Sequence, residues 1–133
     1  MHNEVNTVIS TVAEWDAVTV EPHRFGGREF RLDNVEIGHV HQGGLVDIPF
    51  TRAIRQQLVT EKLAQPHHVL PESGWISFYM RTEADVEKAI WLLRLSYVQK
   101  RLNRSRREPD SRAALVADLD AMQPSSSLRA LIA

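Results

Sequence analysis

Residues 35–50 read Val-Glu-Ile-Gly-His-Val-His-Gln-Gly-Gly-Leu-Val-Asp-Ile-Pro-Phe, and the fold that we predict is built outward from them. Two extended runs, 35–41 and 45–50, flank the turn residues Gln42-Gly43-Gly44. Glycine tolerates positive φ, and three-residue loops that contain it commonly join antiparallel strands. The stretch therefore predicts a β-hairpin.

The length of the loop determines the register of this hairpin. A three-residue loop pairs Val40 with Val46 and His39 with Asp47. Because successive side chains of a strand point to opposite faces, the valine pair and the His–Asp pair lie on opposite sides of the sheet. The sequence thus predicts an apolar core face and a polar face on which an imidazole lies beside a carboxylate.

The preceding hairpin requires an irregularity in strand 35–41. With Asp33-Asn34 as a two-residue turn, the expected pairs are Leu32 with Val35, Arg31 with Glu36 and Phe30 with Ile37. This register buries odd-numbered positions, whereas the following hairpin buries Val40. One extra residue between Ile37 and Val40 removes the conflict, so we expect a β-bulge that begins at Gly38. The bulge places three polar residues on the face opposite the core, namely His39, His41 and Asp47.

Three further strands complete a predicted antiparallel sheet of about five strands. Residues 17–25 and 28–32 flank the turn Gly26-Gly27, and Pro22, which cannot donate to a ladder, places the first of these strands at an edge. Residues 75–80 alternate, with Ile76, Phe78 and Met80 on the core face and Trp75, Ser77 and Tyr79 on the other. The crossover before this strand leaves its place in the sheet open.

Helices are predicted on both sides of the sheet region in the sequence. Apolar residues recur at helical spacing over 4–15, 51–64 and 83–103, and Pro109-Asp110 begins a last helix. We expect the residues after Pro124 to fray or dock weakly. The predicted fold is α+β, a single domain over residues 1–133, with helices 51–64 and 83–103 packed mainly on one face of the sheet.

Composition excludes several classes of site. The 133 residues include no cysteine, which removes disulfides, thiolate metal sites and cysteine nucleophiles. No apolar run approaches the roughly 20 residues of a membrane span, and no basic leader precedes an apolar run at the N-terminus. We therefore expect a soluble cytoplasmic protein without a membrane partner. The net charge of −1 argues against a surface dedicated to DNA.

His39 opposite Asp47 is the sharpest functional signal. A carboxylate beside an imidazole favours the cation and fixes the tautomer, so His39 is a candidate general base with Asp47 as its orienting group. The alternative is an ordinary cross-strand pair that contributes well under about 1 kcal/mol.

A metal site is the second hypothesis for the same residues. His39 and His41 lie on one face of a strand, and with His67 or His68 they make a three-histidine set of the kind that holds catalytic zinc. His67 and His68 point apart in an extended chain, so we expect only one of them to join. Histidines without a metal are the alternative, since the downstream carboxylate of metallohydrolase motifs is not recognisable.

Two more groups are candidate ligand-binding residues. Arg24 and Arg28 bracket Gly26-Gly27 and could hold a phosphate or carboxylate, unless they are solvated arginines of a glycine hairpin. Trp75 and Tyr79 share the polar face and would form the wall of a small-molecule pocket. The alternative for this face is that a terminal helix covers it.

The C-terminal helices suggest two rival functions. Helix 83–103 carries two apolar stripes, so it is either enclosed in the core or shared with a partner, for instance in a homo-oligomer. The basic run Lys100–Arg107 is a weaker candidate for nucleic-acid binding, because a solvated helix end explains its charges equally well.

Several short sequence motifs, in a fixed order along the chain, resemble those of a known family. They are Pro22-His23-Arg24-Phe25-Gly26-Gly27, Glu36-Ile37-Gly38-His39-Val40-His41, Leu45-Val46-Asp47-Ile48-Pro49-Phe50, His67-His68-Val69-Leu70-Pro71, Ser73-Gly74-Trp75-Ile76 and Leu92-Leu93-Arg94-Leu95-Ser96-Tyr97. Over about residues 16–98 the chain resembles the luciferase-domain proteins of bacteria and fungi. The resemblance implies that the His39–Asp47 hairpin and the His67-His68 loop belong to one architecture, and it assigns no catalytic residue. Residues 104–133 form a helical extension outside it.

These observations lead to one working hypothesis. We expect a ligand-binding or enzymatic site on the polar face of the sheet, with a small-molecule ligand and, in one version, a divalent metal. Its rivals are a protein-interaction module and, more weakly, a nucleic-acid-binding domain.

Overall fold

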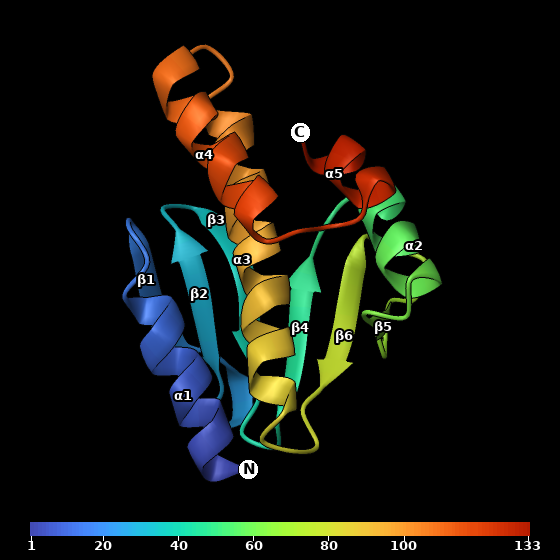
Figure 1. Cartoon of the computed structure of the whole chain (residues 1–133). Helices are drawn as coiled ribbons and strands as arrows, with labels where there is room; N and C mark the ends of the chain where they lie inside the picture. Colours follow the sequence, from blue (N-terminus) through green and yellow to red (C-terminus); the bar gives the residue numbers. More distant parts are fainter.

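The computed structural model describes all residues, 1–133, and has the predicted α+β fold (Figure 1). The helices are α1 (His2–Ala13), α2 (Arg52–Thr60), α3 (Asp85–Arg104), α4 (Pro109–Ala121) and α5 (Ser126–Ile132), with a short 3₁₀ turn, η1, at Arg24–Gly26. The strands are β1 (Val18–Pro22), β2 (Arg28–Leu32), β3 (Val35–Val40), β4 (Leu45–Pro49), β5 (Gln65–Pro66) and β6 (Trp75–Tyr79).

The six strands form one antiparallel sheet in the order β1-β2-β3-β4-β6-β5. β1, which contains Pro22, is an edge strand as predicted. The crossover through α2 returns β6 to the side of β4, which settles the position that the sequence left open. β5 pairs with the outer side of β6 at Gln65–Pro66, where the sequence predicted only a loop.

The predicted hairpin registers are confirmed on both sides of the irregularity in β3. Leu32 pairs with Val35, and His39 pairs with Asp47. The predicted pair of Phe30 with Ile37 is wrong: Phe30 pairs with Gly38 and leaves Ile37 as the extra residue, so the bulge lies one residue earlier than predicted. The carbonyl of Ile37 accepts a hydrogen bond of 2.8 Å from the Ser96 hydroxyl of α3, which stabilises the bulge at this position.

The bulge produces the two faces that the sequence required. Ile37 and Val40 both point into the core and are fully buried, while Glu36 and His39 both face the other side. Gly38 makes the close packing possible, since a Cβ there would lie 2.7 Å from Leu93 Cδ2 of α3. Val35, beside the turn, stays exposed.

The helices cover the core face of the sheet. Figure 1 shows α3 lying across the middle strands, with α1 beside it and α4 packed against its C-terminal half. Both apolar stripes of α3 are therefore enclosed within a single chain; their buried members include Val86, Leu93, Tyr97, Leu95, Val98 and Leu102. Enclosure explains the double stripe without a second copy, and self-association through this helix stays a prediction.

Residues after Pro124 dock firmly, so the expectation of a frayed tail is wrong. Ser125 caps α5 by accepting the amide of Leu128 at 3.0 Å. Leu128 is fully buried and Ile132 nearly so, and α5 packs on α2 (Figure 1). Two apolar residues four positions apart share one helix face, and the neighbouring α2 gave that face a place to bury.

The basic run Lys100–Arg107 is not one solvated surface. Lys100 donates to the carbonyl of Pro49 and to the Ser96 hydroxyl. Arg101 donates to the Tyr97 hydroxyl, and Arg104 pairs with Asp33 at 2.9 Å. These cations serve contacts within the fold, which weakens the observation behind the nucleic-acid alternative. None of the helices combines the length and apolar character needed to span a membrane.

Candidate functional site

Asp47 of β4 is the centre of a histidine cluster on the face of the sheet opposite α3. Its side chain is fully buried, and its Oδ1 accepts a hydrogen bond of 2.7 Å from the Ser77 hydroxyl. Its Oδ2 lies 2.9 Å from the Nε2 of His41, 3.2 Å from that of His68 and 3.3 Å from that of His39. Imidazole and hydroxyl groups from the β3 region, from β6 and from the loop after β5 thus surround one carboxylate.

The environment keeps Asp47 ionised. Burial by itself would raise the pKa of this carboxyl, but hydrogen bonds from His39, Ser77 and His41, with the nearby His67, hold the pKa well below its usual range. The sheet buries a permanent negative charge here, and a buried carboxylate calls for cationic or metal partners.

His39 is held at both ring nitrogens. Its Nδ1 lies 2.7 Å from Glu36 Oε2 and its Nε2 faces Asp47. Burial would lower the pKa of His39, but the hydrogen bonds with Asp47 and Glu36 outweigh it and raise the pKa to about 9. The imidazole is therefore protonated near neutral pH, which does not favour the predicted role of general base, because a base must be unprotonated to accept.

His67 and His68 both approach Asp47, but only His68 enters a set of donor atoms close enough together for a metal ion. The chain is not extended at this point: the Nδ1 of His67 accepts the amides of Val69 and Leu70 at 3.1 and 3.0 Å, which tightens the loop. This fixes the proton of His67 on Nε2, 3.6 Å from Asp47 Oδ1. Burial is the main cause that lowers the pKa of His67. The ring is a neutral donor that shapes the loop, whereas the more exposed His68 presents its Nε2 to Asp47.

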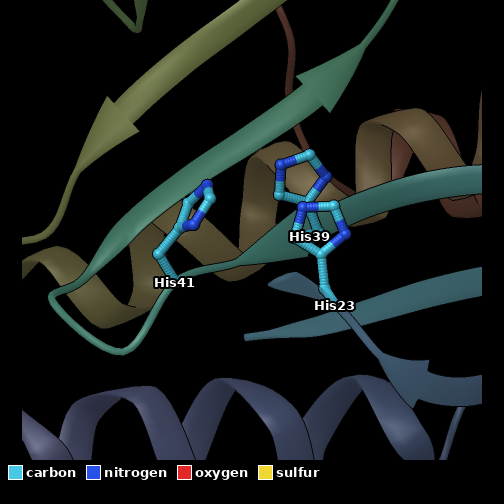
Figure 2. Close-up of side chains that lie close together, drawn as sticks. All are labelled: His23, His39 and His41. Carbon is cyan, nitrogen blue, oxygen red and sulfur yellow. The ribbon is translucent and has the colours of Figure 1, made fainter. Parts of the chain in front are cut away.

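His23 belongs to the cluster, although the sequence analysis did not select it. Its ring stacks on that of His39 with centroids 3.9 Å apart and planes at 20° (Figure 2). Its Nδ1 lies 3.1 Å from Glu29 Oε1, and Glu29 pairs with His39 across β2 and β3. The cross-strand pairing of Glu29 with His39 was a signal that could have pointed to it. Glu36, Glu29 and Ser77 were likewise missed as partners.

The other predicted ligand-binding residues lie at different distances from the cluster. Trp75 lines it, with its ring 5.5 Å from that of His39 and 5.8 Å from that of His67. Tyr79 shares the face but lies against Arg81. Arg28 donates to the carbonyls of Gly26 and Gly27, so it closes its own loop.

Arg24 is exposed in the loop that follows His23, and the next residue, Phe25, is 90% exposed. Val69 and Leu70, which follow His68, are 66% and 53% exposed. Phe25 also adopts a positive φ of 57°, a conformation that a bulky residue rarely takes. The three most exposed large apolar side chains of the chain thus lie on the two loops that carry cluster histidines, which is where a ligand would meet the protein.

Two sets of donor atoms are close enough to hold a metal ion. His41, Asp47 and His68 form one set, and His23, His39 and His41 form the other. Within each set the donor atoms lie within 4.8 Å of one another. Of the predicted ligands, His39, His41 and His68 are in these sets, whereas His67 is not. Asp47 and His23 are ligand candidates that the predicted metal set did not include.

The middle of this architecture is similar to a known protein family. A family model described as the luciferase domain matches residues 34–96, from the turn before β3 to the middle of α3. Residues 34–96 are thus similar to the luciferase domain, which supports a luciferase-domain assignment. The family resemblance noted from the sequence is thereby confirmed. The match includes Glu36, His39, His41, Asp47 and Ser77, while His23 and Glu29 precede it. Searches of the curated proteins and of the solved structures found no match to this chain.

Proposed function

We propose that the luciferase-like domain of this chain is a metal-dependent enzymatic domain that binds one divalent transition-metal ion through His41, Asp47 and His68. The observation that carries the proposal is the convergence of two imidazole nitrogens on Asp47 Oδ2, at 2.9 and 3.2 Å. Donor atoms that bind one ion at roughly 2.1 Å lie about 3.0–3.4 Å apart in octahedral or tetrahedral geometry. The two distances to Asp47 Oδ2 are close to what one ion requires, and all three donor atoms lie within 4.8 Å of one another.

The charge of the site supports the same proposal. Asp47 is buried and ionised, and a divalent cation compensates a buried charge of this kind. Ser77 binds Oδ1, the oxygen that does not face His41 and His68, so it orients the carboxylate as the outer shell of a metal site does. Two imidazoles and one carboxylate suit first-row transition metals rather than calcium or magnesium.

The exposure of the site favours catalysis over a structural role for the ion. Structural zinc sites close their coordination with four protein ligands, whereas catalytic sites use three and keep an open position. Here the set has three members, and His68 lies on an exposed loop. A divalent ion held in this way supplies a Lewis acid and an activated water molecule to a substrate at the open side. His39, cationic between Glu36 and Asp47, would hold the Asp47 carboxylate in place beside the ion.

A second candidate function needs no metal. The chain of contacts from Glu36 through His39 to Asp47 would then bind a polar small molecule, with Trp75 as an apolar wall. We rank it second because it leaves His68 and His41 without a role beyond neutralising Asp47.

Metal binding to protein purified without an affinity tag tests the proposal. We expect Zn²⁺ or Co²⁺ to bind the wild-type chain and raise its melting temperature, because an ion that binds only the folded state stabilises it. His68→Ala, a change on an exposed loop, should weaken the binding at this site at least about a hundredfold, since it removes a direct ligand. His2→Ala is the matched control, as His2 lies on α1 outside the cluster. Equal Zn²⁺ affinities of wild type and His68→Ala would overturn the proposal.

A further inference from the structure

The second set of donors, His23, His39 and His41, lies directly beside the first. Its members come from the loop after β1, from β3 and from the residue that follows β3, and they lie within 4.8 Å of one another. Figure 2 shows the stacked rings of His23 and His39 with the His41 ring beside them, each of the stacked rings turning a nitrogen toward it. The centroid of the His41 ring lies 5.7 Å from that of the His23 ring and 5.0 Å from that of the His39 ring.

Two carboxylates orient this set from outside. Glu29 binds the Nδ1 of His23 at 3.1 Å, and Glu36 binds the Nδ1 of His39 at 2.7 Å. Metal-binding histidines commonly donate the second ring nitrogen to a carboxylate, which fixes the tautomer and leaves the other nitrogen free for the ion. Arg31 in turn holds Glu29 at 2.6 Å, so the outer shell is itself anchored. In both His23 and His39 the remaining donor is Nε2.

His41 is the residue that both sets share. Its Nε2 lies 2.9 Å from Asp47 Oδ2, whereas its Nδ1 has no hydrogen bond within the chain. An imidazole has two nitrogens, so one ring can serve two ions once it has lost both of its N–H protons. The proton on the Nε2 of His39 must also leave when that nitrogen binds an ion. Occupation of both sets therefore releases protons to solvent and forms only metal–nitrogen and metal–oxygen bonds.

We propose that the cluster is a two-metal centre, in which a second divalent ion binds His23, His39 and His41 next to the ion at His41, Asp47 and His68. A set made only of imidazoles suits Zn²⁺ or Cu²⁺. Two ions on opposite nitrogens of one imidazole lie farther apart than the roughly 3.5–4 Å of sites in which two metals clamp one reacting group, so the second ion would hold His41 in place for the first rather than share its substrate. The inference rests on the proposed function, because the two ions share His41.

The number of Zn²⁺ ions per chain tests the inference, measured by equilibrium dialysis and elemental analysis on the untagged full chain. We expect two ions in the wild type and in His2→Ala, and one ion in His23→Ala and in His68→Ala. Glu29→Gln keeps the side-chain volume and all six histidines, and it should weaken the second ion about ten- to a hundredfold while leaving the first unchanged. Circular dichroism of each variant shows whether it is folded, and Glu29→Gln keeps the test open if His23→Ala is not.

Each result separates the two proposals. A wild-type chain that binds one ion, with the same single ion in His23→Ala, overturns the second site and leaves the first in place. A wild-type chain that binds no ion overturns both. Two ions in His23→Ala show that other residues hold the second ion and overturn the assignment made here.

Discussion

Glu36 and His39 face the same side of β3, with Glu36 Oε2 2.7 Å from His39 Nδ1, although they are three positions apart along the strand. In a regular strand, side chains an odd number of positions apart point to opposite faces. The extra residue at Ile37 shifts the alternation by one, so that Glu36 joins the face of His39 and Asp47. The bulge is thus the local feature that builds the carboxylate–histidine–carboxylate chain at the centre of the site.

Glu36→Gln should weaken the second metal ion rather than unfold the protein. The amide still accepts a hydrogen bond from His39 but carries no charge, so the imidazole loses basicity and orientation. We expect the Zn²⁺ affinity of the set that contains His39 to fall about ten- to a hundredfold, as for other outer-shell carboxylates. Isothermal titration calorimetry measures this, and Glu72→Gln, on an exposed loop, is the control. An unchanged affinity in Glu36→Gln would contradict the orienting role of Glu36.

Gly38→Ala should destabilise the fold. Its Cβ would lie 2.7 Å from Leu93 Cδ2 and 3.1 Å from the carbonyl of Asp47, so β3 or α3 must move. We expect a loss of about 1–3 kcal/mol in the free energy of unfolding, measured by urea denaturation. Gly43→Ala is the matched control, because nothing lies within 4 Å of a Cβ at that position. If both variants unfold at the same urea concentration, the close packing of the bulge against α3 is not a constraint.

Leu128→Ala tests the docking of α5. Leu128 is fully buried against α2, so its truncation leaves a cavity and should cost about 2–4 kcal/mol of stability. Leu131→Ala, on the same helix but 42% exposed, should cost well under about 1 kcal/mol. Thermal unfolding of the two variants provides the comparison. A small effect in both would mean that the C-terminal helix contributes little to the fold.

The burial of Lys100 should make the free energy of unfolding rise at alkaline pH. Burial lowers the pKa of its ammonium group from 10.5 to about 8, and the charge of Glu36 opposes the shift only in part. Between these two values the unfolded chain binds more protons than the folded one, so the free energy of unfolding increases as the pH rises through the window. The increase from this group is on the order of 1–3 kcal/mol. Below pH 8 the group is charged in both states and contributes no slope.

The control for this prediction is Lys100→Met, which has no charge to titrate. Urea unfolding at pH 7.5, 8.5 and 9.5 should show a steeper rise for the wild type than for Lys100→Met, and the difference between the two isolates this residue from the tyrosines and other lysines. Parallel curves would mean that Lys100 keeps its ordinary pKa in the fold.

Much of the sheet could be predicted from short-range pattern alone. The turn at Asp33-Asn34 and the loop Gln42-Gly43-Gly44 determine which residues pair, and the alternation of apolar and polar residues determines which face is buried. These are contacts between residues near one another in the sequence, so local chemistry is sufficient to specify them. The pairing of His39 with Asp47 and the need for a bulge follow from the same pattern.

The pattern placed the bulge at Gly38, one position too late, because Ile37 and Gly38 both satisfy the change of register. Ser96, far along the chain on α3, decided between them by donating to the Ile37 carbonyl. The contacts that Lys100 and Arg104 make within the fold could not be predicted either. Basic residues near a helix end give the same sequence pattern whether their side chains are solvated or buried. The position of β6 beside β4 could not be predicted, because 25 residues separate Pro49 from Trp75. No local pattern in this connection indicates next to which strand of the sheet β6 will pair.

The amino-acid sequence by itself therefore determined the two faces of the central hairpin and the presence of an imidazole beside a carboxylate. Only the tertiary structure decided that His23 and His68, from loops at two different parts of the sheet, complete that site. The physical reason is that strand alternation acts over neighbouring residues, whereas the meeting of distant loops depends on how the whole sheet closes around Asp47.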